Sequence, residues 1–156
     1  MAAIIATLVI CYKPNTEAEW EERDQTRLDL PTIRIGRSAD CEVILDITKL
    51  SGKVQRSFVS RKHATMFKWD ENVDYEIMDG VPGEATIAEP DPDPILSACG
   101  VQVNSSRLEP GERRLLKDRD EILIVPNQIK LVYLRPQNQV KDNLEDLTYV
   151  PPEYLI

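Results

Sequence analysis

The sequence predicts an all-β protein built as two packed antiparallel sheets, a β-sandwich, and three features of the chain support this fold class. Short segments rich in β-branched and aromatic residues recur along most of the chain. Several of them alternate between apolar and polar residues, so each presents one face to a core and one to solvent. Turn-forming residues separate the segments. Packing two such sheets face to face is the simplest way to bury the apolar faces.

Eight strands are expected from this pattern. In chain order they are residues 4–12, 32–35, 43–45, 64–69, 73–78, 101–103, 121–125 and 130–135. The first is apolar, but no Lys or Arg precedes it and it is too short to cross a bilayer, so we interpret it as a buried strand. Residues 13–27 are rich in charge and fit either one helical turn or a polar connection.

Residues 1–135 are expected to form one domain, because a chain of 156 residues with 42% hydrophobic residues is long enough for one core and short for two. Residues 80–96 are acidic and rich in Pro, which cannot donate to a β-ladder, so an extended loop is predicted there. The apolar periodicity stops at Pro136. Residues 136–156 are therefore interpreted as a C-terminal tail.

Composition argues against several classes of function. The formal net charge of −8 disfavours a surface that follows a nucleic-acid backbone. The three cysteines, Cys11, Cys41 and Cys99, are widely spaced and form no Cys-x-x-Cys pair, which favours a reducing compartment such as the cytoplasm. His63 is the single histidine, so a His-rich metal site is excluded. No metal, cofactor, nucleic acid or membrane is expected as a partner.

The charge distribution has one anomaly. Residues 47–69 contain no Asp or Glu but hold six cations, namely Lys49, Lys53, Arg56, Arg61, Lys62 and Lys68. Such a cluster fits either a solvated basic face or a docking site for an anion. Serines stand among these cations, and hydroxyl donors beside positive charges suit the oxygens of a phosphate group.

Two short loops concentrate these residue types. Gly36-Arg37-Ser38 follows the alternating strand 32–35, and Ser60-Arg61-Lys62-His63 precedes the apolar strand that begins at Ala64. Glycine permits a tight turn after the first strand. Both loops lie at strand ends, so we expect them to converge on one rim of the sandwich.

These motifs resemble those of the forkhead-associated (FHA) domain. The resemblance covers residues 28–134 and rests on IGRS at 35–38, VSRKHA at 59–64, Asn104 before Arg107-Leu108, and LKDRDEILI at 116–124. It implies an FHA/SMAD-like β-sandwich that binds phosphothreonine in a partner protein. A non-catalytic signalling adaptor or regulator is the function that follows.

The resemblance also implies roles for individual residues. Arg37, Ser60 and Arg61 match the positions that bind the phosphate. Apart from the resemblance, the basic stretch makes Lys53 and Arg56 candidates for flanking contacts if their loop folds over the site, and Cys99 is a third candidate. Gly36, His63 and Asn104 match positions that support the binding loops.

One motif departs from the family pattern. Ser97-Ala98-Cys99-Gly100 stands in place of the family's Ser-Thr-Asn-Gly, so Cys99 replaces the asparagine that holds the main chain of the ligand. A thiol is a weak hydrogen-bonding group, which weakens or removes that contact. Residues 80–96, an insertion relative to the family, precede this motif. They either contribute contacts for residues beside the phosphothreonine or inhibit the site, with Glu84, Glu89, Asp91 and Asp93 replacing the phosphate.

Three alternatives stay open. The chain fits a phosphorylation-independent interaction module with a degenerate phosphate site. An enzyme that pairs Cys99 with His63 is disfavoured, because no Gly-rich nucleotide loop, metal constellation or carboxylate dyad accompanies the pair. Thr148 lies in an acidic stretch of the tail; it is either part of an ordinary terminus or a phosphorylation site for self-association.

Overall fold

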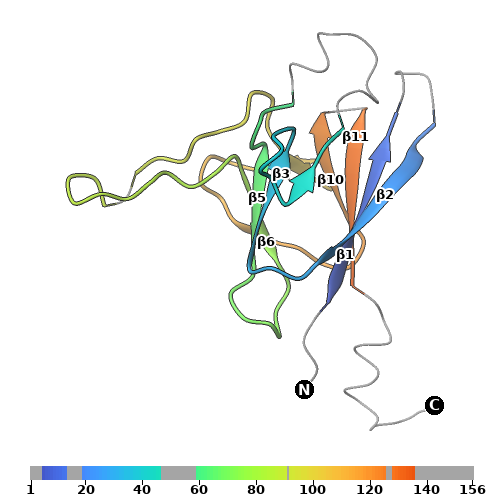
Figure 1. Ribbon diagram of the computed structural model, residues 1–156, viewed down its shortest axis with the longest axis horizontal. Coiled ribbons are helices and arrows are strands. Elements are labelled where there is room, and N and C mark those ends of the chain that lie inside the picture. The colour runs from blue at the N-terminus through green and yellow to red at the C-terminus, as the bar shows by residue number, and fades with distance from the viewer. Residues whose placement is uncertain (1–4, 14–18, 47–58, 91, 126–127, 136–156) are drawn as a thin grey trace, which may run out of the picture.

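The computed structural model describes residues 5–13, 19–46, 59–90, 92–125 and 128–135. These residues form two β-sheets and no helix. Figure 1 shows the sheets as two layers, with β3, β5 and β6 in one and β1, β2, β10 and β11 in the other. The predicted all-β sandwich is therefore confirmed.

The larger sheet has six strands in the order β2-β1-β11-β10-β7-β8, and every pair for which a register is given is antiparallel. The strands are β1 (Ala6–Tyr12), β2 (Glu21–Leu28), β7 (Gln102–Val103), β8 (Ser106–Arg107), β10 (Asp120–Val125) and β11 (Ile129–Leu134). We call it the six-stranded sheet. The chain enters it at β1 and leaves it at β11, and these two strands pair along six residues.

The smaller sheet has five strands in the order β4-β3-β5-β6-β9. The strands are β3 (Thr32–Gly36), β4 (Val43–Ile44), β5 (Ala64–Phe67), β6 (Glu76–Asp79) and β9 (Arg114–Leu115). We call it the five-stranded sheet. The sheet is mostly antiparallel; the exception is β4 at one edge, which runs parallel to β3, with Ile35 opposite Val43.

The core lies between the two sheets and is built from alternate residues of the strands. Leu8 and Ile10 of β1 and Ile122 of β10 face Ile35 and Met66 from the other sheet, and all five side chains are buried. Each aliphatic side chain buried in this way stabilises the fold by roughly 1.5–3 kcal/mol. This apolar contact between the sheets fixes where the strand ends, and hence the connecting loops, lie.

Strand β2 corrects the interpretation of residues 13–27. Residues 21–27 were expected to form a helical turn or a polar connection, but they belong to an edge strand paired with β1. Most side chains of β2 are exposed and only Leu28 is fully buried. An edge strand with many charged side chains lacks the apolar alternation that identifies a strand, and such charges protect the edge from unwanted pairing.

The remaining differences concern strand ends and very short strands. Strand β6 begins at Glu76 and not at residue 73, because the backbone turns at Asp70, whose carbonyl accepts from Val73 N–H at 3.2 Å. Strand β5 ends at Phe67, two residues earlier than expected. Strands β8 and β9 have two residues each and were not predicted, because neither contains a buried apolar residue that would mark it in the sequence.

Residues 80–96, which we call the arm, leave the sandwich between β6 and β7. Figure 1 shows the arm as a long, narrow excursion away from both sheets. The described part of it holds no extended strand, and Val81 and Ile95 form an isolated antiparallel bridge at its base. The tail at 136–156 lies outside the described residues. Within the described ranges no helix is long and apolar enough to span a membrane.

Candidate anion-binding site

The loop after β3 and the loop before β5 meet at one end of the five-stranded sheet. Strand pairing explains this, since Ile35 near the end of β3 lies opposite Ala64 at the start of β5. Two backbone hydrogen bonds continue the pairing into the loops: Arg37 N–H donates to Ser60 O at 3.3 Å, and Ser38 N–H donates to Arg61 O at 3.2 Å. The structure thus brings Arg37, Ser60 and Arg61 together at what we call the rim.

Arg37 is oriented by its own loop partner. Its Nε donates a 2.7 Å hydrogen bond to Val59 O, while the residue as a whole is exposed. That bond uses one of the five N–H donors of the guanidinium, and with respect to the described residues both terminal Nη groups remain for a ligand. Among the described residues, no carboxylate pairs with Arg37 or Arg61.

Ser60 has a hydroxyl group that is held by one accepted hydrogen bond. Ser60 Oγ accepts a 2.8 Å hydrogen bond from Ala98 N–H, which connects the loop before β5 to the segment before β7. A hydroxyl has one hydrogen and two lone pairs, so its O–H hydrogen remains to be donated. The half-buried Ser60 therefore offers a neutral donor beside the cations of the rim.

His63 joins three loops from a fully buried position. Its Nδ1 accepts from Ser60 N–H at 3.0 Å, so Nε2 carries the hydrogen and donates to Gly100 O at 2.9 Å. Its backbone N–H donates to Ile35 O, and its carbonyl accepts from Gly80 N–H. Burial lowers the pKa of His63, an effect that the hydrogen bond to Gly100 and the nearby Asp79 partly offset. The His63 ring is therefore neutral and acts as a structural support, a neutral brace, that holds the loops together.

Gly36 is required by a close backbone approach. A Cβ on Gly36 would lie 2.0 Å from the carbonyl oxygen of Arg61 and 2.9 Å from that of Ser60. The tight turn expected after the strand is not the reason, because Gly36 is still part of β3 and does not adopt a positive φ. The absence of a side chain lets the two rim loops touch.

The segment that departs from the family pattern is a braced turn. Ser97 N–H donates to Asp79 Oδ1 at 3.1 Å, and Gly100 N–H donates to Ser97 Oγ at 2.8 Å. Gly100 has a φ of 90°, which favours glycine. Cys99 lies inside this turn, next to the bond from Ala98 to Ser60, and is half-buried.

Asn104 makes its contacts away from the rim, at the turn between β7 and β8. Its amide Nδ2 donates to Asp120 Oδ1 at 2.8 Å, and its Oδ1 accepts from Glu121 N–H at 2.9 Å. Its backbone N–H donates to Glu121 O at 2.8 Å. These bonds fasten the β7–β8 turn to β10 and stabilise the residue in a left-handed conformation, with φ of 50°.

The rim encloses an open cleft of about 620 Å³. It is lined by Arg37, Ser38, Asp40, Ser60, Arg61, Lys62, Val81, Ile95, Leu96 and Ala98. Three cations face one carboxylate, so the cleft is net positive in an acidic protein. Asp40 accepts from the Ser38 hydroxyl, which lowers the pKa of Asp40, and its Oδ2 lies 3.9 Å from Lys62 Nζ.

Several lining residues were not predicted as site residues. Lys62 belongs to the basic stretch of the sequence, which is a usable signal, and Ser38 and Asp40 follow Arg37 in the same loop. Val81, Ile95 and Leu96 come from the base of the arm. No sequence motif marks these three, because only the folded position of the arm brings them to the cleft.

The structure does not describe some of the expected contributors, and others lie elsewhere. Lys53, Arg56 and Thr148 lie outside the described residues. In Figure 1 the arm extends away from the sandwich, and within the described ranges none of Glu84, Glu89 or Asp93 forms an ion pair with Arg37 or Arg61. The described carboxylates of the arm therefore make no inhibitory ion pair with the arginines of the rim in this structure. Asp91 lies outside the described residues.

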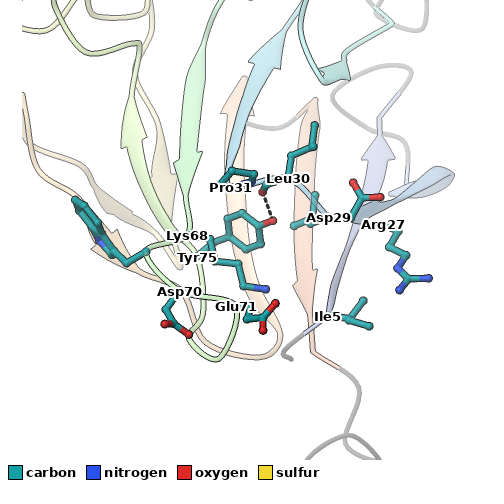
Figure 2. Close-up of a pocket in the computed structure, with 11 residues that line it drawn as sticks. Ile5, Arg27, Asp29, Leu30, Pro31, Lys68, Asp70, Glu71 and Tyr75 are labelled. Atoms are coloured by element: carbon teal, nitrogen blue, oxygen red, sulfur yellow. Dashed lines mark hydrogen bonds between the residues drawn. The ribbon is translucent and has the colours of Figure 1, made fainter. Parts of the chain in front are cut away.

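A second cavity, of about 400 Å³, lies at the opposite end of the sandwich. Figure 2 shows Tyr75 at its centre, with the Tyr75 hydroxyl donating to Leu30 O at 2.5 Å. Leu30 precedes β3 and Lys68 follows β5, whereas the rim loops follow β3 and precede β5. Three carboxylates and two cations line this cavity, which are Asp29, Asp70, Glu71, Arg27 and Lys68. The cavity is therefore less suited to an anion than the rim.

Comparison with known proteins identifies the family. The FHA domain model matches residues 33–125, more than half of the chain and all of the described rim. A search of curated proteins found no match.

Similar solved structures agree with this family. They include the FHA domain of an Arabidopsis thaliana hypothetical protein, with 20% sequence identity, coverage of 86% of this chain and 88% of that one, and a TM-score of 0.59. The Slr1951 protein from Synechocystis sp. also has 20% identity, with coverage of 86% and 98% and a TM-score of 0.53. A structure from an analysis of phosphothreonine-dependent FHA domain interactions has 20% identity, coverage of 83% and 95%, and a TM-score of 0.51. With its sandwich, its two braced loops and the match across them, the chain belongs to the FHA domain family.

Proposed function

We propose that the rim binds a phosphothreonine-containing segment of a partner protein and that the protein is a non-catalytic signalling adaptor or regulator. One observation supports this proposal above all: Arg37 and Ser60 lie on two loops that are hydrogen-bonded to each other. Each of the two side chains keeps donor groups that a ligand can use. Arg61 and Lys62 add positive charge to the same cleft.

The chemistry of a phosphorylated threonine suits these donors. Phosphorylation adds roughly −1.5 to −2 charges and three strong acceptor oxygens. The Nη groups of Arg37 supply a planar fork, and the Ser60 hydroxyl supplies a third donor. Charge-assisted hydrogen bonds contribute about 1.5 to 3 kcal/mol each, so two or three of them support micromolar binding after ordering costs are subtracted.

The comparisons support the ligand class. One protein of the same fold is described in terms of phosphothreonine-dependent interactions, and the family resemblance implies a preference for phosphothreonine over phosphoserine. The free thiols of Cys11, Cys41 and Cys99 fit a reducing compartment, so we propose a cytoplasmic location.

Binding without catalysis is proposed because His63 is unsuited to act as a base. Both of its ring nitrogens already have partners, Ser60 N–H and Gly100 O. A general base needs a free lone pair within reach of the proton that it removes. Within the described residues, no three His, Cys, Asp or Glu side chains cluster as a metal site.

A phosphorylation-independent interaction module is the alternative, and Cys99 is the observation that favours it. The thiol stands where the family has an amide beside the ligand, which weakens one polar contact. The donors of Arg37 and Ser60 favour the phosphate-dependent function, because they converge on one cleft.

The test is fluorescence polarisation with a peptide library carrying one fixed phosphothreonine, together with the phosphoserine and unphosphorylated versions. A peptide of residues 140–156 phosphorylated at Thr148 is a separate probe for self-association. We expect binding to the phosphothreonine peptides only, and a loss of roughly tenfold or more in Arg37→Ala, equivalent to about one charge-assisted bond.

Arg27→Ala is the matched control, because Arg27 is an exposed arginine at the opposite end of the sandwich. It removes the same charge from the protein and leaves the rim intact. Equal binding by wild type and Arg37→Ala, or equal binding of phosphorylated and unphosphorylated peptides, contradicts the proposal.

A further inference from the structure

A groove on the outer face of the five-stranded sheet adjoins the cleft of the rim. Its volume is about 350 Å³, and its lining includes Thr32, Phe67 and Pro82. Lys62 and Val81 line both the groove and the cleft. The two hollows are therefore neighbours at the base of the arm.

The floor of the groove is held in a fixed position. Phe67 of β5 lies opposite Thr32 of β3 and opposite Glu76 of β6. The guanidinium of Arg113 lies 4.1 Å from the centre of the Phe67 ring, a cation–π contact that holds the half-buried ring in place. An aromatic surface is thus presented on a face where most side chains are polar.

The overhanging wall is fixed as well. At the base of the arm, Val81 N–H donates to Ile95 O at 3.0 Å and Ile95 N–H donates to Val81 O at 2.9 Å. The buried hydroxyl of Thr65 donates to Gly80 O at 2.7 Å, which ties the base of the arm to β5. A preformed groove of this kind binds an extended segment at lower entropic cost than a loop that must first become ordered.

The charges in the groove are largely neutralised. Arg34, which also lines it, makes bonds of 3.0 and 2.8 Å to the two carboxylate oxygens of Glu42, a pairing that lowers the pKa of Glu42 to about 2. Glu84 adds a negative charge at the wall. With Phe67, Val81 and Pro82 as its apolar surface, the groove suits an apolar side chain better than a second phosphate.

The spacing matches one extended peptide. Phe67 lies three residues along β5 from Ala64, or about 10 Å, and the rim loop extends past Ala64, so the Phe67 end of the groove lies on the order of 15 Å from the rim. An extended peptide covers that distance in about four or five residues. The groove is thus within reach of a segment whose phosphothreonine occupies the rim.

We propose that the groove receives an apolar side chain of the bound segment, about four or five residues from the phosphothreonine. This inference rests on the proposed function, since the phosphothreonine fixes the segment at the rim. The partner is then a protein whose phosphothreonine is followed or preceded at that spacing by a residue such as Leu, Ile or Phe.

Three variants test the groove. Phe67→Ala removes its floor, and Thr32→Trp fills it from an exposed position that needs no change in the core. Leu115→Ala is the matched control: Leu115 is exposed and lies in the same cross-strand row, opposite Glu76, but outside the groove. Each variant is titrated with the tightest phosphothreonine peptide from the library and with the same peptide carrying Ala at the apolar position.

We expect library selection of an apolar residue at one position about four or five residues from the phosphothreonine. Phe67→Ala and Thr32→Trp should weaken the parent peptide by roughly fivefold to tenfold, the loss of one apolar contact. They should leave the Ala-substituted peptide unchanged, and Leu115→Ala should change neither.

Phosphate-dependent binding without an apolar preference at that spacing, or equal weakening of both peptides by the groove variants, overturns the groove proposal alone. In that case Arg37→Ala still binds both the parent peptide and the Ala-substituted peptide more weakly than the wild type does. Absence of any phosphate-dependent binding by the wild-type protein overturns both proposals together.

Discussion

The backbone N–H of Ser60 donates to Nδ1 of His63 at a distance of 3.0 Å, and this contact couples a buried histidine to a residue of the rim. The bond requires Nδ1 to be unprotonated. Protonation of His63 replaces the acceptor with a second donor, so the Ser60 N–H loses its partner. The arrangement of the rim therefore depends on a neutral His63.

Acidification below about pH 6.5 is expected to reduce stability through His63. In the unfolded chain the imidazole titrates near its ordinary pKa of about 6.5, whereas burial lowers its pKa in the folded protein. Between those two pKa values the unfolded state binds more protons, so the free energy of unfolding falls as pH falls through this window. The loss is complete below the folded pKa.

Urea unfolding from pH 7.5 to 5.0 measures this effect, with His63→Asn as the comparison. The variant should be less stable at pH 7.5 by about 1 to 3 kcal/mol, since at least one of the two ring hydrogen bonds is lost. Its stability should change little with pH in this window, because Glu42 and Glu112 have lowered pKa values and titrate at more acidic pH. Identical pH profiles for the two proteins contradict the assignment of His63 as a neutral brace.

Gly36→Ala is expected to disrupt the rim through a direct clash. The new Cβ would lie 2.0 Å from Arg61 O, a backbone atom that moves only if the whole loop moves. Phosphopeptide affinity should fall at least as far as in Arg37→Ala, because Arg37 and Arg61 are both displaced. Stability should fall by about 1 to 3 kcal/mol, the usual cost of overpacking.

Gly111→Ala is the control for Gly36→Ala, because it adds backbone strain at a position away from the rim. Gly111 has a φ of 81° and nothing within 4 Å of its would-be Cβ, so the variant costs about 1 kcal/mol of backbone strain. Its phosphopeptide affinity should match that of the wild type. Wild-type affinity in Gly36→Ala, measured by fluorescence polarisation, contradicts the role given to the close approach.

The fold class and the place of the two loops could be predicted because both depend on local patterns. Apolar alternation identifies the central strands, and the strand residues beside Arg37 and Ser60 pair with each other, so the loops had to leave the sheet at the same end. Strand β2 was missed because it lacks the apolar alternation by which the other strands were found. Its exposed position at an edge removes the alternation.

The arm's contribution could not be predicted, because it depends on contacts between residues distant in sequence. The bond from Thr65 to Gly80 and the bridge from Val81 to Ile95 decide where the arm begins, and so place Val81 beside both the cleft and the groove. A Pro-rich, acidic composition indicates only an extended loop. The same limit applies to Asp40, whose place in the cleft follows from the path of the loop after β3.

Cys99→Asn is expected to strengthen phosphopeptide binding. The turn that holds Cys99 is already fixed by the bonds of Ser97 to Asp79 and of Ala98 to Ser60. An amide at this position supplies a donor and an acceptor that the thiol lacks. One added neutral hydrogen bond is worth about 0.5 to 1.5 kcal/mol, so affinity should rise roughly twofold to tenfold.

Cys99→Ala is the control, because it removes the thiol without adding a polar group. It should bind the phosphothreonine peptide about as well as the wild type, which places the gain in Cys99→Asn on the amide and not on loss of the sulfur. The family pattern implies that the amide acts on the main chain of the peptide, so the gain should persist when residues flanking the phosphothreonine are replaced by Ala. Unchanged affinity in Cys99→Asn means that the ligand's main chain does not pass this turn, and the path of the segment across the rim must then differ from the one the family pattern implies.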